Sequence, residues 1–357
     1  MKQLSDHNTH TTRQAILALL RAALTNTVSP LPASLHWDDI MEVANEQGVL
    51  AMVYDGYCAY AKESAVEISL KDKANLYGNV KKIELAYDRQ KRVVERLARL
   101  YGEHGIRMMV LKGYGLSTLY PVPNHRQCSD VDIFLYGRYD DGDALVEQEW
   151  KIPVSREHHH HTRFVVDGIL VENHFDFVNV HAHASGASME RELKSLVERE
   201  DGEEILIDGV VVYGMPPTLG ALFLLRHTAQ HFAARHIELR HLIDWLLFAR
   251  KNYAKIDWGI VDRVAQEMGL KSFLEALDNL AKSLVEDVEL SDIEQRIMLD
   301  IWAPKYKDCD DIEIGIKSWY YKALRWWGNR WKNRLVYKES LLNQAWTLVT
   351  SRFIKPL

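Results

Sequence analysis

The sequence predicts an α+β fold in which an α/β core lies between two helical regions. Apolar residues recur at three- and four-residue spacing over residues 12–100, and the same helical pattern returns after residue 218. Between these stretches, short apolar runs typical of strands alternate with turn residues. We therefore expect an N-terminal helical region at 1–100, an α/β core at 101–215 and a C-terminal helical region at 216–357.

The N-terminal region carries helical patterns over residues 12–24, 37–57 and 73–105. The loop VSPLPAS separates the first two, because proline interrupts a helix. Gly102 and Gly105 are placed to end the third helix, and the apolar run IRMMVLKG that follows is typical of a buried strand.

The core continues with a helix at 113–121, a Pro-containing turn at 122–127, a strand at 130–136 and a helix at 143–150. Two β-rich runs then meet at Asp167-Gly168. Because this dipeptide favours a two-residue type I′ turn, we expect a β-hairpin here.

Composition excludes several classes of protein. A chain of 357 residues with 47% hydrophobic content can bury a substantial core, and its formal net charge of −6 gives no overall attraction to nucleic acid or membrane. Cys58, Cys128 and Cys309 lie far apart, which argues against a disulfide framework or a zinc ribbon. We find no apolar stretch that suits a signal peptide or a transmembrane segment, and we expect a cytoplasmic protein.

The segment CSDVDIFLYG, residues 128–137, places two carboxylates inside an apolar run. Alternation along a strand puts Asp130 and Asp132 on one face, while Val131 and Ile133 point into the core. Two neighbouring like charges are costly unless a cation or several donors lie between them. A divalent metal would neutralise the pair, and a solvated strand end paired with Lys or Arg is the alternative.

The hairpin has a definite register when residues are counted outward from its turn. The facing pairs on its polar side are Arg163 with Glu172, His161 with His174, and His159 with Asp176. The other side carries Phe164, Val171, Phe175 and Phe177, with Asn173 as a polar exception. On neighbouring strands, Asp130, Asp132 and Glu172 can hold two Mg²⁺ ions for phosphoryl or nucleotidyl transfer. A solvent-exposed edge hairpin without function is the alternative.

The stretch VLKGYGLSTLYPVPNHRQCSDVDIFLYG, followed by VENHFDF, resembles the nucleotidyltransferase superfamily that includes DNA polymerase beta and aminoglycoside nucleotidyltransferases. It looks closest to a bacterial branch of largely uncharacterised nucleotidyltransferase-like proteins. The pattern of that branch is Leu-Lys-Gly, a Tyr-rich helix, an Arg, an Asp-x-Asp strand and a later acidic-x-His strand. WDDIMEVANEQGV and LLRHTAQH are similar to the branch as well, so the resemblance covers most of the chain. It implies a mixed sheet of the nucleotidyltransferase type.

The resemblance also implies roles for individual residues. The implied metal ligands are Asp130, Asp132 and Glu172, and the implied contacts to the nucleotide phosphates are Lys112, Gly113 and Arg126. Backbone N–H groups after Gly113 and the guanidinium of Arg126 suit phosphate oxygens, whereas a solvated Lys and an ordinary loop Arg are the alternative.

In the implied mechanism, two Mg²⁺ ions bridge the triphosphate and align an acceptor hydroxyl for attack at the α-phosphate. Glu172 or Asp132 deprotonates or orients that hydroxyl, and His174, followed by His161, assists as an acid, a base or a neighbour of the ligands.

One position departs from the superfamily. Gly113 is followed by Tyr114, where the superfamily normally has Gly-Ser or Gly-Gly. Ser117, one helical turn later, is the candidate for the phosphate contact of the missing serine. The departure leaves open whether the chain is catalytically active.

Four histidines follow in the C-terminal region. His227 and His231 stand four residues apart, a helical spacing that can bind metal, and His236 and His241 come after them. No Glu completes a His-Glu-x-x-His pattern, so we expect these side chains to pack against the core or to reach its cleft. Asp244 is expected to cap a helix or to pair within the same helical bundle.

Residues 317–338, KSWYYKALRWWGNRWKNRLVYK, contain seven Lys or Arg, seven Trp or Tyr, and no acidic residue. We expect a Trp-rich packing helix whose basic side chains extend to water. Binding of RNA by charge and stacking, or of an anionic membrane surface, are the alternatives.

Together the patterns and the resemblance predict Mg²⁺-dependent transfer of a nucleoside monophosphate from an NTP to an unknown acceptor hydroxyl. A non-catalytic nucleotide-binding or sensor protein on the same fold is an alternative, favoured by the missing Gly-Ser and opposed by the complete set of carboxylates. A metal-dependent glycosyltransferase that uses Asp-x-Asp is opposed by the Lys-Gly loop and the Glu-x-His hairpin. The acceptor, the base preference and the oligomeric state cannot be read from the sequence.

Overall fold

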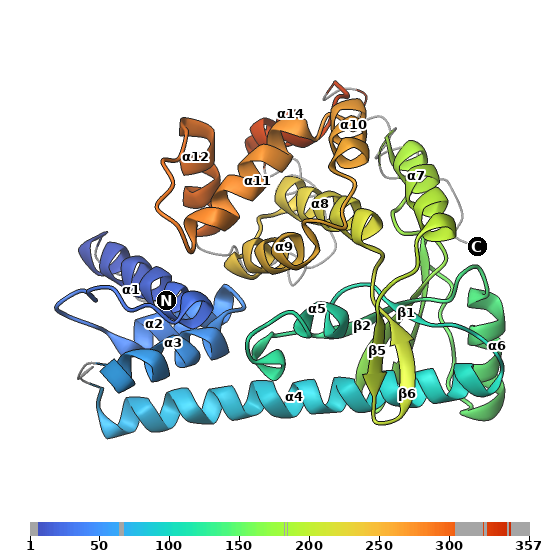
Figure 1. Cartoon of the computed structure of the whole chain (residues 1–357), viewed down its shortest axis with the longest axis horizontal. Helices are drawn as coiled ribbons and strands as arrows, with labels where there is room; N and C mark the ends of the chain where they lie inside the picture. The colour runs from blue at the N-terminus through green and yellow to red at the C-terminus, as the bar shows by residue number, and fades with distance from the viewer. Residues whose placement is uncertain are drawn as a thin grey trace.

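The computed structural model describes residues 6–63, 68–181, 183, 185–303, 324, 327–340 and 343. These residues form the expected α+β architecture, with a six-stranded mixed sheet and many helices (Figure 1). The strands are β1 (Met109–Val110), β2 (Asp130–Phe134), β3 (His161–Val166), β4 (Ile169–His174), β5 (Glu204–Ile207) and β6 (Val210–Tyr213).

The helices begin and end as follows. Up to the middle of the sheet they are α1 (Asp6–Thr25), α2 (Trp37–Glu46), α3 (Leu50–Glu63), α4 (Leu70–Glu103), α5 (Tyr114–Ser117), the 3₁₀ turn η1 (Pro123–His125), α6 (Tyr139–Glu149) and α7 (Gly186–Arg199). After the last strand they are α8 (Pro217–Ala234), α9 (Leu239–Asn252), α10 (Trp258–Met268), α11 (Lys271–Ser283), α12 (Asp292–Ile301) and α14 (Arg330–Val336). Within the described part of the chain, the helices are too short or too polar to cross a lipid bilayer.

The sheet has the order β3-β4-β2-β1-β6-β5 and combines parallel with antiparallel neighbours. β2 runs parallel to β4, and β1 runs parallel to β6. The remaining neighbours, β1 with β2, β3 with β4 and β5 with β6, are antiparallel. The β2–β4 pair matters most for function because it sets the side chains of these two central strands next to each other.

The two faces of the sheet contribute to two separate cores. Val131 and Ile133 of β2 point to one face and pack in a cluster with Val94 and Leu97 of α4, as strand alternation predicts. Phe134, on the opposite face, belongs to a larger cluster shared with α7, α8 and the N-terminal helices. The sheet is therefore covered on both sides, and polar side chains on its strands need a cleft or a partner.

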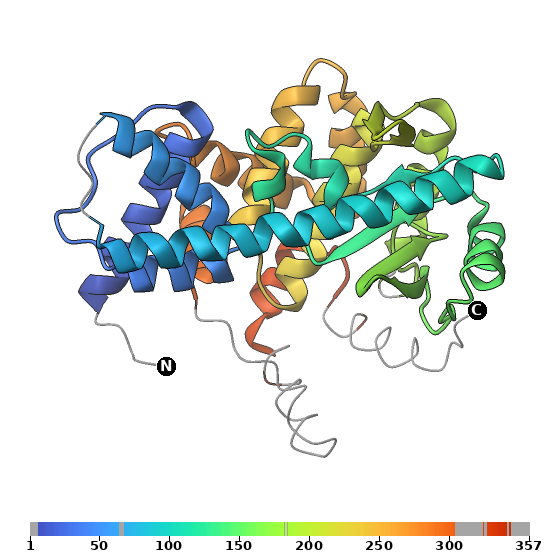
Figure 2. The same ribbon diagram turned by 90° about the horizontal axis from the view of Figure 1, so that it is seen from below.

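The long helix α4 connects the N-terminal helices to the sheet, and Figure 2 shows it crossing the molecule. Its first turn is capped by Ser69, whose hydroxyl accepts the Asp72 N–H at 3.1 Å. Leu76 packs with the N-terminal helices, whereas Leu97 packs under the sheet. One helix thus contributes to both cores.

The helix expected at 37–57 is wrong as one continuous element, because the structure divides it into α2 and α3. Gly48 between them has φ +66°, a left-handed conformation that ends a helix. The neighbouring Gln47 is buried and binds the C-terminal helices, with its Nε2 2.8 Å from the Ile301 carbonyl and its Oε1 accepting the Leu239 N–H at 3.0 Å. These long-range hydrogen bonds fix the break.

The predicted hairpin is confirmed from its turn to the pair of His161 with His174. Asp167 and Gly168 both have positive φ, as a type I′ turn requires. The pairing expected between His159 and Asp176 is wrong, because the carbonyl of His160 accepts the N–H groups of both Phe175 and Asp176. The regular ladder therefore ends at His161.

The apolar side of the hairpin is confirmed in part. Phe164 and Val171 pack in the core under α4, but Phe177 lies beyond the strand and stacks on Phe134 in the opposite core, with ring centroids 4.4 Å apart. Helix α7 and the second hairpin, β5–β6, are not among the predicted elements.

The basic aromatic segment 317–338 is described only at residues 324 and 327–338, and its other positions lie outside the described residues. In the described part, Lys332 of α14 is buried, with Nζ 2.6 Å from Asp300 Oδ2. Packing accounts for this part of the segment. The RNA and membrane alternatives for the other positions stay predictions.

Candidate functional site

A cleft of about 480 Å³ lies between the sheet and the helices α8 and α9. Its sheet side includes Lys112, Gly113, Asp130 and Glu172, and its helical side includes His227, His231, Arg240 and His241. This volume is in the range of small-molecule sites, so the cleft can accept a ligand of nucleotide size.

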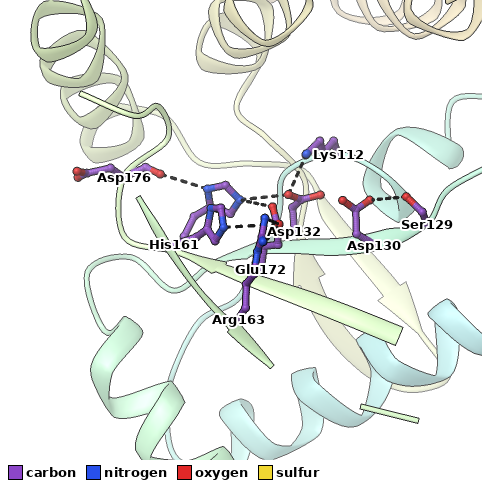
Figure 3. Close-up of polar contacts among 9 residues, drawn as sticks. Lys112, Ser129, Asp130, Asp132, His161, Arg163, Glu172 and Asp176 are labelled. Carbon is purple, nitrogen blue, oxygen red and sulfur yellow. Dashed lines mark hydrogen bonds and ion pairs between the residues drawn. The ribbon is translucent and has the colours of Figure 1, made fainter. Parts of the chain in front are cut away.

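The three predicted carboxylates lie near one another on β2 and β4 (Figure 3), and Asp130 and Glu172 line the cleft. Asp132 and Glu172 are direct neighbours on the parallel strands β2 and β4. Asp132 is fully buried at 0% exposure, and Glu172 is buried at 8%. Asp130, at the start of β2, is partly exposed and accepts a hydrogen bond from the Ser129 hydroxyl at 3.3 Å. The carboxylates thus lie at different depths on one side of the strand.

Lys112 is the cation closest to the buried carboxylate, with Nζ 3.0 Å from Asp132 Oδ1. Burial works against both charges. The ammonium of Lys112, together with His174, nevertheless holds the pKa of Asp132 well below its usual range, and the acidic neighbours raise the pKa of Lys112. Burial, followed by the charge of Asp132, raises the pKa of Glu172. Asp132 is therefore the stronger acid of the pair, and Glu172 is the better proton acceptor.

Two further contacts orient this pair of carboxylates. His174 places Nε2 3.1 Å from Asp132 Oδ1 and Nδ1 3.2 Å from the Asp176 carbonyl oxygen. Arg163 donates to Glu172 Oε1 from Nε at 2.9 Å and from Nη2 at 2.6 Å. The second oxygen of Glu172 is left facing the histidine, with Oε2 3.9 Å from His174 Nε2.

The donor atoms that lie closest together are two carboxylates and an imidazole. Asp132, Glu172 and His174 each offer one atom within 4.8 Å of the other two, and in the described part of the chain Asp130 stands outside this group. His161 lies beside it, with Nε2 3.6 Å from Glu172 Oε1. Burial and the neighbouring histidines lower the pKa of His161 to about 2, so this ring is neutral near pH 7.

The loop after β1 depends on Gly113, which has φ +53° and ψ −112°. A Cβ at this position would lie 3.2 Å from the Asp130 carbonyl oxygen, so glycine allows the loop to lie against the start of β2. The ring of Tyr114 is buried and stacks on Tyr87, with centroids 5.4 Å apart. Ser117 is fully buried, and its hydroxyl donates to the Tyr114 carbonyl at 2.6 Å. This position is not compatible with the phosphate contact expected from Ser117.

Arg126 lines the cleft but is already held by a carboxylate. Its Nε and Nη2 donate to the two oxygens of Asp244 at 2.8 and 2.7 Å, and the hydroxyl of Tyr120 donates to Asp244 Oδ1 at 2.7 Å. The expectation that Asp244 caps a helix or pairs within the helical bundle is therefore wrong, because its partners come from the loop before β2. Nη1 of Arg126 is buried without a hydrogen-bond partner among the described residues.

The sequence predicts that the histidines of the C-terminal region either pack against the core or reach its cleft, and the structure shows that they reach the cleft. His227, His231, His236 and His241 all line it, from α8, α9 and the loop between them. Arg240 lies there too, and no sequence pattern singled it out. Arg240 could have been predicted as a cleft residue only from its position next to His241 in the first turn of a helix.

Comparison with known proteins agrees with the sequence resemblance. Among curated proteins, no sequence matches this chain. The crystal structure of an antigenic nucleotidyltransferase-like protein from Paracoccidioides brasiliensis is similar at 17% sequence identity, over 53% of this chain and 93% of that chain, with a TM-score of 0.34. The model of a family described as uncharacterised nucleotidyltransferase matches residues 33–286, which is more than half of the chain. The chain therefore belongs to this uncharacterised nucleotidyltransferase family.

Proposed function

We propose that the protein is a Mg²⁺-dependent nucleotidyltransferase that moves a nucleoside monophosphate from an NTP to an acceptor hydroxyl. The observation that carries the proposal is the pair Asp132 and Glu172, neighbours on parallel strands, with Glu172 and Asp130 in the lining of a nucleotide-sized cleft. We also infer that the family falls in the DNA polymerase beta-type superfamily, on the strength of the Asp-x-Asp strand and the later acidic strand.

The donor set fits a divalent metal ion. Asp132 Oδ2 is buried and has no hydrogen-bond partner among the described residues. A bound metal ion would satisfy this oxygen. The Asp176 carbonyl holds His174 through Nδ1, and Nε2 points at Asp132 Oδ1 3.1 Å away, a contact that a metal bound by both residues would replace. Asp132, Glu172 and His174 would hold one ion, and Asp130 would help to hold a second. When bound, Mg²⁺ offsets the negative charge of the triphosphate.

The residues of the chain have separate tasks in the transfer. Lys112 provides a fixed positive charge beside the carboxylates, where the phosphates of the nucleotide enter. Glu172, whose pKa is raised and whose Oε1 is held by Arg163, accepts the proton of the acceptor hydroxyl. The acceptor oxygen then forms a bond to the α-phosphorus while the bond from that phosphorus to the bridging oxygen breaks. Diphosphate leaves with the electron pair.

A nucleotide-binding protein without catalysis is the second candidate, and two observations favour it. Tyr114 stands where the superfamily has Ser or Gly and turns its ring into the core, and Lys112 sits directly on the carboxylate of Asp132. Such a protein would bind an NTP and release it unchanged. A glycosyltransferase is not favoured by the family to which the chain belongs.

Calorimetry with non-hydrolysable analogues of the four NTPs tests the proposal, with and without Mg²⁺, on the wild type and on Asp132→Asn. We expect Mg²⁺-dependent binding of at least one analogue and its loss in the variant. An acceptor screen with labelled nucleotide then separates transferase from sensor, because only the transferase labels an acceptor. Absence of binding by the folded wild type would refute both candidates.

A further inference from the structure

The helical side of the cleft carries polar side chains that the transfer of a nucleotide, as proposed above, does not use. They are His227 and His231 of α8 and Arg240 and His241 of α9, and we call them the histidine–arginine wall. The ring centroids of His227 and His231 are 4.5 Å apart, and those of His231 and His241 are 5.4 Å apart. The wall faces the same space as Asp130 and Glu172.

The imidazoles of His227, His231 and His241 are close enough to hold a metal ion. The hydrogen bonding of His241, however, argues against a metal site. Its Nδ1 accepts the backbone N–H of Glu238 at 3.0 Å, as part of the capping box that begins α9. In the neutral ring the proton is then on Nε2, so His241 offers an N–H donor. Histidines that bind metal show the reverse, donating the second ring N–H and keeping a lone pair for the ion.

The charges around the wall also favour an anion over a cation. Burial, and then Lys112, followed by His231, His241 and Arg240, lower the pKa of His227 well below its usual value. The charges of Lys112 and Arg240 oppose a divalent cation and attract an oxyanion, while Glu238, whose Oε2 lies 3.5 Å from Arg240 Nη2, offsets part of this charge. His227 and His231 both line the cleft, where their ring nitrogens can meet a ligand.

Arg126 adds a buried donor to the same cleft. Two of its nitrogens are held by Asp244, and Nη1 is buried with no partner in the described part of the chain. A buried guanidinium N–H without an acceptor is costly, and a bound oxyanion would satisfy it.

We propose that the histidine–arginine wall, together with Arg126, is an oxyanion subsite that binds a phosphate group of the substrates opposite the carboxylates. The proposal rests on the proposed function and deepens it, because it assigns phosphate recognition to the C-terminal helices. Imidazole and guanidinium N–H groups donate to the phosphate oxygens. The phosphate belongs either to the β,γ end of the NTP or to a phosphorylated acceptor.

Calorimetry with inorganic pyrophosphate and inorganic phosphate, in the absence of divalent metal, tests the subsite on the full chain. The variant is His231→Gln/Arg240→Gln, and the control is His104→Gln, which changes a half-exposed histidine near the C-terminal end of α4. We expect saturable binding to the wild type, unchanged binding to the control and a loss of about tenfold or more in the variant, because hydrogen bonds to charged groups are involved. Circular dichroism checks that each variant is folded.

Further titrations identify the source of the phosphate. If the wall holds the β,γ-phosphates, the variant loses affinity for NTP and pyrophosphate but not for NMP; if it holds the acceptor, the variant loses affinity for inorganic phosphate but not for NTP. Either pattern supports the subsite. Absence of phosphate and pyrophosphate binding, equal binding to wild type and variant, or tight Zn²⁺ binding that the variant loses would each overturn it.

The metal-free titration also separates this proposal from the proposed function. Asp132→Asn is expected to abolish Mg²⁺-dependent NTP binding and to keep pyrophosphate binding, since Asp132 is not part of the wall. Pyrophosphate binding by a wild type that binds no NTP would therefore leave the subsite standing and refute only the nucleotidyltransferase assignment.

Discussion

Replacing Asp244 with asparagine is expected to destabilise the protein strongly, although the two side chains have nearly the same shape. Asp244 is the acceptor for Arg126, which comes from the loop before β2, and for the hydroxyl of Tyr120. The pair joins the C-terminal helix α9 to the core that carries the carboxylates. Loss of the negative charge therefore affects both the stability of the fold and the cleft.

The magnitude follows from the burial of this pair. The side chains of Arg126 and Asp244 are only 2% and 9% exposed, and their two hydrogen bonds are 2.8 and 2.7 Å long. Removing one partner of such a pair leaves the other charge buried and uncompensated, at a cost of about 3–5 kcal/mol in the free energy of unfolding. Replacing both partners by apolar residues, as in Arg126→Met/Asp244→Leu, is expected to recover most of that loss.

Urea denaturation followed by tryptophan fluorescence measures the effect. The matched control is Asp287→Asn, which breaks the ion pair with Arg21 at 2.8 Å but changes a side chain that is 95% exposed. We expect no measurable change in the control, because water already screens that pair. Equal unfolding midpoints for Asp244→Asn and Asp287→Asn would refute the reasoning.

Three other changes test separate parts of the account. Nucleotide binding is expected to be tighter with Mn²⁺ than with Mg²⁺, since His174 adds a nitrogen ligand. Calorimetry with each metal measures the difference in affinity, and His174→Ala should remove that difference. Tyr114→Ser is expected to lower the free energy of unfolding by about 3–5 kcal/mol, measured by urea denaturation, because it removes a buried ring that stacks on Tyr87. We expect no stronger NTP binding from this variant. Tyr114→Phe, which keeps the ring, is the control. Burial raises the pKa of Glu190 to about 7, so the folded chain keeps a proton that the unfolded chain loses above about 4.5. The contribution of Glu190 to stability should be largest below pH 4.5 and fall as the pH rises to 7, and the difference in stability between the wild type and Glu190→Gln should change over that range.

The parts of the site that the sequence predicts well depend on local rules. Strand alternation puts Asp130 and Asp132 on one side, and the Asp167-Gly168 turn fixes Arg163 opposite Glu172, as the structure has them. Both rules act over a few residues, so they can be applied without knowledge of the rest of the fold.

The parts that the sequence does not predict depend on partners far away in the chain. Arg126 and Asp244 are separated by 118 residues, and neither has a pattern that points to the other. Gln47 ends α2 because it binds residues of α9 and α12, which no helical periodicity reveals. Ser117 has the right residue type for a phosphate contact, but it is fully buried, and its hydroxyl donates to the Tyr114 carbonyl and lies 3.3 Å from the Tyr87 hydroxyl of α4. In each case tertiary packing decides what the side chain does.

The charges of the cleft give the two sides different tasks. The sheet side concentrates carboxylates, which attract divalent cations and repel phosphate, and Lys112 and Arg163 each contact one of them. The helical side carries Arg240 and the histidines of α8 and α9, whose N–H groups can donate to phosphate oxygens, while Glu238 and Asp244 each lie beside an arginine. A nucleotide with its metal ions carries both kinds of charge, so it needs both sides at once. Because the Arg126–Asp244 pair holds the helices against the loop before β2, its loss would separate two half-sites that are each unable to bind the complete substrate.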